Sequence, residues 1–547
     1  MGSLEGGETV LCVATRGRPK IKFIQKRWAA ELAPGFAQIG ADRSRESATG
    51  RPVPQHREAS TAGGHMAAQD ARSDGADASL ALKNEGNAAL ARGRYAEAIS
   101  CYSRALEADP SSPVLYSNRA MAHIKAESYG LAIADAEASI RLDASYIKAY
   151  YRRGSANFAL GKYKLALRDF RAVCKLRPND RDARLKLKEC ERAAKQLAFA
   201  VAIESEDAAP LSASLDVATI SVDAAYDGPH LPEDGAPTDE FITEMLERFR
   251  AQKLIHRKYV LQILLRTKEL LEAEKSLVDL EIGDRDRITI CGDVHGQFYD
   301  LLHIFEINGR PSSSNPYVFN GDLVDRGSFS FEVVLSLFAL KVQHPGGVHI
   351  NRGNHETKNM SKIYGFEGEV RHKYDATVLA LFHECFQWLP LAACVEKKVF
   401  VTHGGLSSDD GVTLDDVRKV SRNREPPDAG LMCDLLWSDP QAQDGRSPSK
   451  RGVGLSFGPD VTRAFLERNG LDLVVRSHEV RDNGYEVEHG GSLITVFSAP
   501  NYCDAMGNKG AFIHLSAALE PKFTTYDAVP HPPLRPMAYA SASPFGL

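Results

Sequence analysis

Five short apolar runs in the second half of the chain each end in residues of the types that bind metal ions. The runs and the polar residues that follow them are 288–290 with Asp293 and His295, 317–319 with Asp322, Asp325 and Arg326, 348–350 with Asn354 and His355, 399–401 with His403, and 473–475 with His478. One Asp-x-His pair alone would most often be a buried hydrogen-bonded pair or a solvated loop. The recurrence of five runs, with glycines beside nearly every polar residue, indicates one common site, because glycine lets the backbone turn sharply beside an ion.

Each apolar run has the length of a strand, and this predicts how the polar residues are brought together. Groups just beyond the carboxyl ends of strands are where open α/β architectures build sites, because the loops converge there while the sheet holds them rigid. Two amphipathic helical stretches over 239–275 precede the first run. We therefore expect an α/β domain with its site at one edge of the strands.

The order of these motifs resembles the phosphoprotein phosphatase family of dinuclear metallophosphoesterases over roughly residues 240–530. The motifs as far as Gly-Asn-His-Glu at 353–356 are shared with metallophosphoesterases in general. The segments Ser-Ala-Pro-Asn-Tyr-Cys at 498–503 and Trp-Ser-Asp-Pro at 437–440 resemble the serine/threonine protein phosphatases in particular. The resemblance implies a metallophosphoesterase domain with a central β-sandwich flanked by helices.

The resemblance also implies the ligands of two divalent metal ions. One ion would be held by Asp293, His295 and Asp322, and the second by Asp322, Asn354, His403 and His478, so that Asp322 bridges them. Carboxylates, imidazoles and an amide oxygen suit manganese, iron or zinc. A water shared by two ions loses its proton near neutral pH, so the expected reaction is hydrolysis of phosphoserine and phosphothreonine on proteins by a metal-bound hydroxide.

Proton transfer and phosphate binding fall to other residues. We assign His355 as the general acid for the leaving serine or threonine oxygen, oriented by Asp325, because a third histidine ligand could not easily also deliver a proton. Guanidinium forks suit bidentate recognition of phosphate. The residues to which the resemblance gives phosphate recognition are Arg326, Asn354, Arg451 and Tyr502.

The first half of the chain repeats itself. Tyrosines recur at 95, 129 and 163, and small residues recur at the same step at 86, 120 and 154 and at 98, 132 and 166. This period and these residue types resemble the tetratricopeptide repeat, a pair of helices that stacks on its neighbours. Three repeats over 79–180 and a capping helix over 181–200 are therefore expected to form an all-α solenoid.

Five polar residues on the inner helices of the repeats match the positions at which chaperone-binding repeats hold the terminal carboxylate of a peptide. They are Lys83, Asn87, Asn118, Lys148 and Arg152. Any one of them alone would be ordinary solvated surface. Cations and amide donors together satisfy a main-chain carboxylate, so we expect an acidic C-terminal tail of Hsp90 type as a partner.

The resemblance further implies that the repeats restrain the enzyme. A linker expected over 201–236 keeps them at high effective concentration beside the phosphate pocket of a catalytic domain over 237–530. Glu127, in the turn between the helices of the second repeat, is the candidate for the inhibiting carboxylate, and a solvated turn residue is the alternative. Outside these regions, a disordered extension over 1–75 and a C-terminal tail over 531–547 are expected.

The overall composition and net charge argue against several classes of protein. The net charge of -5 gives no reason to expect nucleic-acid or membrane-surface binding, and no apolar stretch is long enough for a bilayer. The nine cysteines form no Cys-x-x-Cys pair, which favours a reducing compartment, and we expect the cytoplasm and nucleus. A small-molecule phosphoesterase and a non-catalytic co-chaperone remain alternatives, the first disfavoured by residues 498–502 and the second by the complete ligand set.

Overall fold

The computed structural model describes residues 63–203 and 210–540. Most of the extension expected over 1–75 therefore lies outside the described residues. From Gly63 onward the structure describes helix α2, which includes residues 63–75 of that stretch.

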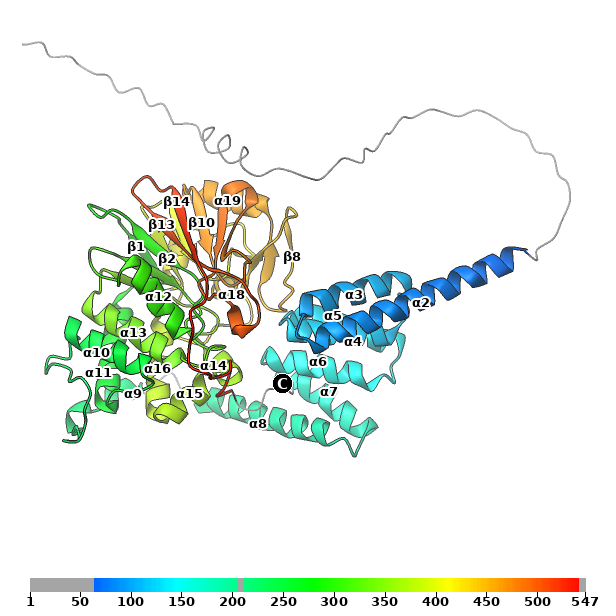
Figure 1. Cartoon of the computed structure of the whole chain (residues 1–547), viewed down its shortest axis with the longest axis horizontal. Helices are drawn as coiled ribbons and strands as arrows, with labels where there is room; N and C mark the ends of the chain where they lie inside the picture. The colour runs from blue at the N-terminus through cyan, green and yellow to red at the C-terminus, as the bar shows by residue number, and fades with distance from the viewer. Residues whose placement is uncertain (1–62, 204–209, 541–547) are drawn as a thin grey trace, which may run out of the picture. The chain divides into compact units, whose positions relative to one another are not determined.

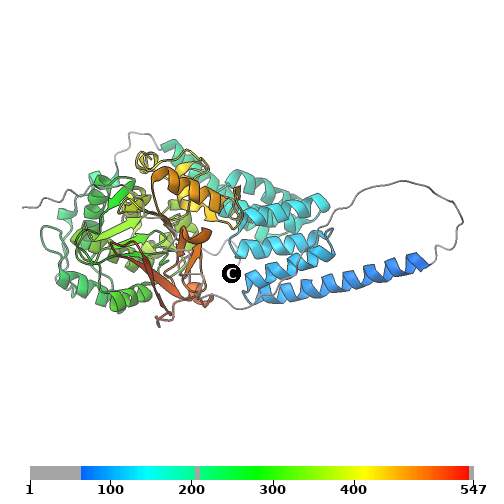
Figure 2. The ribbon, with the colours of Figure 1, turned by 90° about the horizontal axis from the view of Figure 1, so that it is seen from above.

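Helices make up the whole repeat region. They are α2 (Gly63–Ala91), α3 (Tyr95–Ala108), α4 (Pro113–Lys125), α5 (Tyr129–Leu142), α6 (Ile147–Ala159), α7 (Tyr163–Leu176) and α8 (Arg181–Ile203). Figure 2 shows that α2 runs on well beyond its neighbours. The recurring small residues lie where helices meet: a Cβ on Gly86 would lie 2.7 Å from the ring of Tyr102. The predicted solenoid of helical hairpins is therefore confirmed.

The segment expected as a linker has an ordered second part. Residues 201–203 belong to α8, and after the gap come α9 (Leu211–Ser214) and the short 3-10 helix η2 (Val217–Thr219). Val217 and Leu231 are buried in the helical core of the catalytic region. The backbone N–H groups of Leu211 and Ser212 donate to the carboxylate of Glu384. Much of 210–236 is thus fastened along the catalytic region.

Capping residues and apolar faces explain where the helices of the catalytic region form. They are α10 (Asp239–Arg250), α11 (Arg257–Ala273), α12 (Phe298–Asn308), α13 (Ser330–Gln343), α14 (Lys358–Tyr364), α15 (Phe366–Lys373), α16 (Ala376–Trp388), α17 (Leu414–Arg418), α18 (Leu431–Trp437) and α19 (Pro459–Asn469), with short turns η3 (His489–Gly491) and η4 (Tyr502–Asp504). Thr238 caps α10 by accepting the N–H of Phe241, while acidic residues occupy the first turn and arginines the last. This charge order complements the helix dipole.

Two mixed sheets form the centre of the catalytic region. Their strands are β1 (Leu277–Leu280), β2 (Ile288–Cys291), β3 (Tyr317–Asn320), β4 (Val348–Asn351), β5 (Ala392–Val395), β6 (Val399–Thr402), β10 (Leu473–Arg476), β11 (Tyr485–Glu488), β12 (Leu493–Val496), β13 (Gly510–Leu515) and β14 (Pro521–Tyr526). One sheet has the order β1-β5-β6-β10-β12-β11 and the other β14-β13-β2-β3-β4. A small third sheet joins β7 (Asp439–Pro440), β9 (Leu455–Phe457) and β8 (Arg446–Pro448). The five strands expected from the sequence are β2, β3, β4, β6 and β10.

The two large sheets face each other across an apolar layer. Ile290 and Val318 of one sheet share a buried cluster with Val401, Val475 and Val496 of the other. Helices α10, α11, α13 and α16 gather on one side of this sandwich (Figure 1) and form a second buried cluster. The β-sandwich flanked by helices is therefore confirmed.

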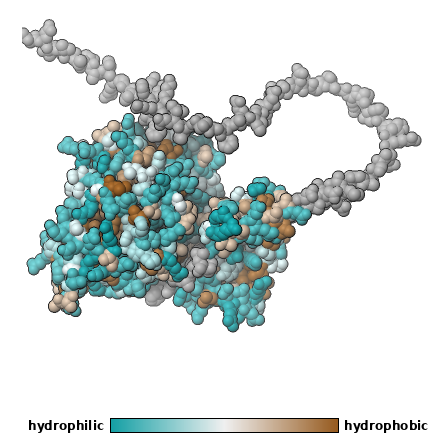
Figure 3. Space-filling view, in the orientation of Figure 1, coloured by the Kyte–Doolittle hydropathy of each residue, from teal (hydrophilic) through white to brown (hydrophobic). Residues whose placement is uncertain are grey.

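The surface visible in Figure 3 is mostly hydrophilic over the described part of the chain, with hydrophobic residues scattered singly or in small groups. Among the described helices, none has the length and apolar character needed to cross a membrane.

Candidate active site

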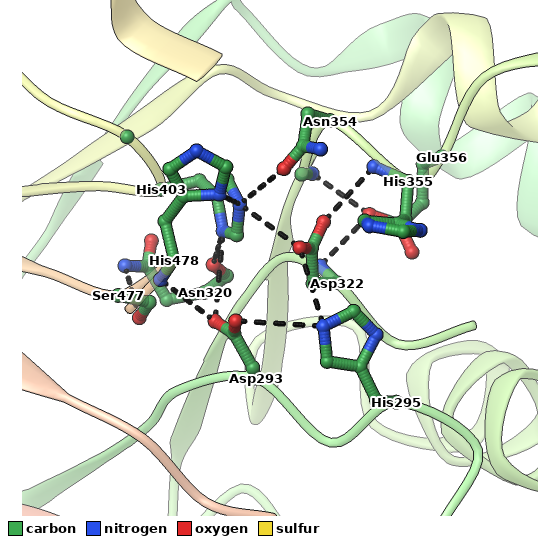
Figure 4. A network of polar contacts seen from close by, with 12 residues as sticks. Asp293, His295, Asn320, Asp322, Asn354, His355, Glu356, His403, Ser477 and His478 are labelled. Atoms are coloured by element: carbon green, nitrogen blue, oxygen red, sulfur yellow. Dashed lines mark hydrogen bonds and ion pairs between the residues drawn. The ribbon is translucent and has the colours of Figure 1, made fainter. Parts of the chain in front are cut away.

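Parallel strands bring the metal-binding candidates to one edge of the sandwich. Strands β2, β3 and β4 are consecutive parallel neighbours, and β6 is parallel to β10 in the other sheet. Their carboxyl ends therefore open into the same region. Figure 4 shows the side chains that meet there, which are Asp293, His295, Asp322, Asn354, His355, His403 and His478.

The first group of ligand atoms surrounds His295. Its Nδ1 lies 3.0 Å from the carbonyl oxygen of Val324 and donates to it, so a neutral ring carries its lone pair on Nε2. That Nε2 lies 3.6 Å from Oδ2 of Asp293 and 3.5 Å from Oδ2 of Asp322. A lone pair and two carboxylates this close together form a donor set that suits a cation.

The second group surrounds His403 in the same way. Its Nδ1 donates to the carbonyl oxygen of Asn320 at 2.8 Å, which leaves the lone pair on Nε2. Within reach of Nε2 are Oδ1 of Asn354 at 2.9 Å, Nδ1 of His478 at 3.1 Å and Oδ2 of Asp322 at 3.3 Å. The two groups share Asp322, so the residues present fit a pair of cations with one bridging carboxylate.

The pKa shifts of the clustered side chains also favour a site that binds positive charge. All these side chains are buried. Burial raises the pKa of Asp293 to about 7, with the charge of Asp322 adding to the rise. Burial opposes a charge on His403, but the Asp322 carboxylate outweighs it and raises its pKa to about 9. Burial lowers the pKa of His295 to about 3. Carboxylates crowded together in this way attract positive charge, which a protonated His403 supplies in the chain alone and a bound cation could supply instead.

His355 stands beside the ligands but is held differently. Its Nδ1 lies 2.8 Å from Oδ2 of Asp325, whose other oxygen accepts the N–H of Phe366 at 3.0 Å. Burial lowers the pKa of His355 to about 4 and raises that of Asp325 to about 8. His355 is also near enough to His295 and Asp322 to join them around an ion. Because its Nδ1 is engaged by Asp325, only Nε2 is free to face a ligand.

The phosphate-binding candidates lie on two sides of this cluster. Arg451 makes a two-pronged ion pair with Asp439 and donates to the carbonyl oxygen of His478 at 2.8 Å. The ring of Tyr502 lies 5.1 Å from that of His295. Arg326 is buried, with its guanidinium 3.8 Å from the ring centre of Tyr364.

Backbone strain is concentrated at the candidate residues. Positive φ values occur at His295 (46°), Asp322 (50°), Asp325 (72°), Arg326 (69°) and His478 (69°). Each such conformation costs a non-glycine residue about 1–3 kcal/mol and persists only where the surroundings hold it. Nothing in the residue types alone could have shown this feature.

Glu356 is a site residue to which the sequence analysis gave no role. Its fully buried carboxylate accepts N–H groups from Asp322 at 2.9 Å, Leu323 at 2.8 Å and Gly353 at 2.8 Å. A Cβ on Gly353 would lie 2.2 Å from Oδ1 of Asp322, so only glycine fits there. Glu356 therefore ties the loop after β3 to the loop after β4. The signal was present, because Glu356 ends the Gly-Asn-His-Glu motif.

The turn between α4 and α5 supplies a carboxylate to this site. Glu127 pairs with Nη2 of Arg326, and it is one of the non-glycine residues with positive φ. Next to it, the hydroxyl groups of Tyr129 and Tyr364 lie 2.5 Å apart. Neither tyrosine was among the expected site residues, because their meeting joins positions far apart in the sequence.

Further contacts hold the same turn against the loop at 449–452. The N–H of Gly130 donates to the carbonyl oxygen of Lys450 at 3.0 Å, and Nζ of Lys162 donates to that of Gly452 at 3.1 Å. A Cβ on Gly130 would lie 2.7 Å from the backbone nitrogen of Gly452. The approach is therefore as close as two backbones permit.

The five repeat residues expected to bind a carboxylate are partly brought together. Asn118 donates to Oδ1 of Asn87 at 3.2 Å, and Lys148 is exposed on α6. Arg152 has a buried Nε without a hydrogen-bond partner among the described residues, and burial lowers its pKa. Lys125, which the sequence analysis missed, lies near enough to Arg152 for the two charges to repel, so burial and Arg152 both lower its pKa.

Known families match both halves of the chain. Residues 286–482 match the calcineurin-like phosphoesterase family, and residues 86–127 and 147–180 match tetratricopeptide repeat families. Residues 187–279 match the PPP5 TPR repeat region.

Individual proteins are similar over most of the chain. Serine/threonine-protein phosphatase 5 of Homo sapiens is 54% identical, over 84% of this chain and 92% of the human protein. Serine/threonine-protein phosphatase T of Aspergillus oryzae is 50% identical, over 85% of this chain and 98% of that protein. A solved structure of a protein serine/threonine phosphatase from Saccharomyces cerevisiae, with similarity to human phosphatase PP5, is 44% identical with a TM-score of 0.54 and covers 55% of this chain and 100% of its own.

Proposed function

The chain belongs to the serine/threonine-protein phosphatase 5 family and is a protein serine/threonine phosphatase, and on this premise we propose which residues carry the reaction and how the repeats control it. The observation that supports the proposal best is the pair of ligand groups that share Asp322. This family membership sets aside the small-molecule phosphoesterase and the non-catalytic co-chaperone.

Two divalent ions are proposed for the two groups. The first is held by Asp293, His295 and Asp322, and the second by Asp322, Asn354, His403 and His478. Oxygen and imidazole ligands without thiolate suit manganese, iron or zinc. When bound, such ions would lower the pKa of a water and offset the negative charge of phosphoryl oxygens.

The surrounding side chains position the phosphate. Arg451, which donates to the carbonyl oxygen of His478, and the buried Arg326 would supply guanidinium groups to the phosphate, and Asn354 and Tyr502 would complete the pocket. Arg451 is held by Asp439 and cannot swing away, so its donors are oriented before substrate arrives. Preorganised donors of this kind stabilise developing charge without a reorganisation cost.

His355 is proposed as the general acid. Asp325 holds its Nδ1, so Nε2 is the atom that carries the proton toward the leaving serine or threonine oxygen. The negative charge of a bound phosphate favours the protonated imidazole, against the burial that lowers its pKa in the protein alone. His355 is therefore assigned as a proton donor and not as a metal ligand.

Glu127 is proposed to inhibit the enzyme by occupying the phosphate site. Its carboxylate pairs with Arg326 where a phosphoryl group would bind, and the Tyr129, Gly130 and Lys162 contacts hold its turn in place. The repeats would leave the site when a partner binds the open form more tightly.

The proposed partner is the acidic C-terminal tail of an Hsp90-type chaperone. Lys83, Asn87, Asn118, Lys148 and Arg152 would hold its terminal carboxylate. Support comes from Arg152, whose buried Nε has no hydrogen-bond partner among the described residues and could donate to an anionic ligand. Phosphoproteins are the substrates, and the cytoplasm and nucleus are the proposed compartments, in keeping with the eight free cysteines of the described chain.

Replacing the bridging carboxylate tests the metal assignment. Asp322→Asn should lower bound metal and reduce turnover of a phosphoserine peptide by more than about 100-fold, because both ions lose a charged ligand. The measurement is elemental analysis of the purified chain beside a phosphate-release assay. Asp527→Asn, which changes an exposed carboxylate away from the site, is the control. Full activity at normal metal content in Asp322→Asn would refute the assignment.

A further inference from the structure

The loop that carries Arg326 is held by a stretch near the end of the chain that the reaction chemistry does not use. We name residues 535–539 the C-terminal strap. Three hydrogen bonds join it to the loop, namely Met537 N–H to the Arg326 carbonyl oxygen (2.8 Å), Ser328 Oγ to the Arg535 carbonyl oxygen (2.7 Å) and Ala538 N–H to Ser328 Oγ (3.1 Å). The strap therefore binds the Arg326 backbone and the Ser328 side chain, which lie on either side of Gly327.

The strap also touches the guanidinium itself. The sulfur of Met537 lies 4.0 Å from Nη1 of Arg326, and the ring of Tyr364 covers one face. Nη2 pairs with Glu127, and Nε has no hydrogen-bond partner among the described residues. When Glu127 leaves, Met537 and Tyr364 remain as the contacts that fix where the guanidinium points.

The loop needs such support because its conformation is unfavourable. Asp325 and Arg326 are consecutive non-glycine residues with φ of 72° and 69°. Strain of about 1–3 kcal/mol at each position persists only where neighbouring structure holds it. The hydrogen bond from Met537 falls on the second of these two residues.

The strap is itself anchored to the catalytic region. Met537 packs against Met360, Ile363 and Tyr364. The ring of Tyr539 lies 5.1 Å from that of His372, and a Cβ on Gly368 would lie 2.0 Å from the carbonyl oxygen of Tyr539. None of these anchors comes from the repeats, so the strap can stay in place when the repeats move.

We propose that Met537 is a positioning residue for the phosphate-binding guanidinium of Arg326, acting from the C-terminal strap. The inference rests on the function proposed above for Arg326. Because Met537 contacts the guanidinium of Arg326 and side chains of α14, its loss weakens phosphate binding more than it slows proton transfer. Phosphate affinity is therefore the quantity that responds.

The test uses the full chain carrying Glu127→Ala, so that the carboxylate does not compete for Arg326. Inhibition by inorganic phosphate and the kcat and KM for p-nitrophenyl phosphate are measured for Met537→Ala. The inhibition constant should rise about fivefold, with a smaller change in kcat, because a misplaced binding group loses affinity. Met537→Leu should restore most of the affinity, since leucine refills the volume. Met121→Ala removes another partly buried methionine, from α4 of the repeats, and should leave the constant unchanged.

A double-mutant cycle separates positioning from general destabilisation. Arg326→Ala should weaken phosphate binding by itself, and adding Met537→Ala should then cause no further loss, because the effect passes through the guanidinium. If Met537→Ala alone leaves the constant unchanged, or weakens binding equally without Arg326, the positioning role is wrong. If Arg326→Ala itself has no effect, the proposed role of Arg326 fails, and the inference fails with it.

Discussion

His403 shows how its surroundings orient the ring of a single candidate metal ligand. One ring nitrogen donates to the Asn320 carbonyl oxygen, and this hydrogen bond directs the other nitrogen, with its lone pair, at Asn354 and Asp322. His295 uses the Val324 carbonyl oxygen in the same way. Backbone acceptors thus select the tautomer of each ligand. His355 differs from both because a carboxylate, and not a carbonyl oxygen, holds its Nδ1.

The difference in partner predicts a difference in function at His355. His355→Asn should keep its bound metal but lose roughly 10²–10⁴-fold in kcat on a phosphoserine peptide, because an alkoxide leaves poorly without a proton. An activated aryl phosphate should suffer much less, since its leaving group needs no acid. Metal analysis and kcat on both substrates are the measurements.

His303→Asn is the matched control, because His303 lies on α12 at the surface and pairs only weakly with Glu306. It should leave both rates unchanged. Equal slowing of the two substrates by His355→Asn would show that His355 is not the general acid. Loss of metal would show that it is a ligand.

At the scale of elements, the strands were predictable and their supports were not. Strands β2, β3, β4 and β6 are short apolar runs with a glycine beside the polar residue that follows, and β10 is a similar run followed by Ser477 and His478, so local sequence indicates both the strand and the candidate ligand after it. Glu356 and Tyr364 act through contacts with loops far away in the sequence. No local pattern distinguishes such residues from ordinary buried ones.

The linker over 210–236 illustrates the same limit, because its sequence does not show where it packs. Residues 210–236 lack periodicity because they form little regular structure, yet Val217 and Leu231 are buried against α11 and its neighbours. A composition rich in small and polar residues predicts a loop correctly but does not show where that loop lies. The hydrogen bonds to Glu384, which fix its course, depend on the tertiary fold.

At the scale of elements, the testable prediction concerns Lys148 on helix α6. Lys148→Ala should weaken binding of a peptide with an acidic C-terminal tail about tenfold, because a charge-assisted hydrogen bond is worth about 1.5–3 kcal/mol. Calorimetric titration of the full chain measures it. Lys164→Ala, an exposed lysine on α7, should have no effect. Unchanged affinity in Lys148→Ala would show that α6 does not hold the carboxylate.

At the scale of the whole molecule, the proposed control depends on one residue pair between the repeats and the catalytic region. Glu127 comes from a turn of the repeats, and Arg326 comes from the loop after β3. A ligand in the repeat groove can relieve inhibition only by its preference for the form in which this pair is broken. The same guanidinium would then serve inhibition in one state and phosphate binding in the other.

The most direct test of this account is kcat/KM of the full chain on a phosphoserine peptide, with and without Glu127→Ala. We predict a rise of about tenfold, as expected if the closed form holds roughly nine-tenths of the molecules. Glu107→Ala, an exposed glutamate on α3, controls for loss of a charge from the repeats and should leave the rate unchanged. Equal kcat/KM for the native chain and Glu127→Ala would contradict the account, because the carboxylate would then not hold the site closed.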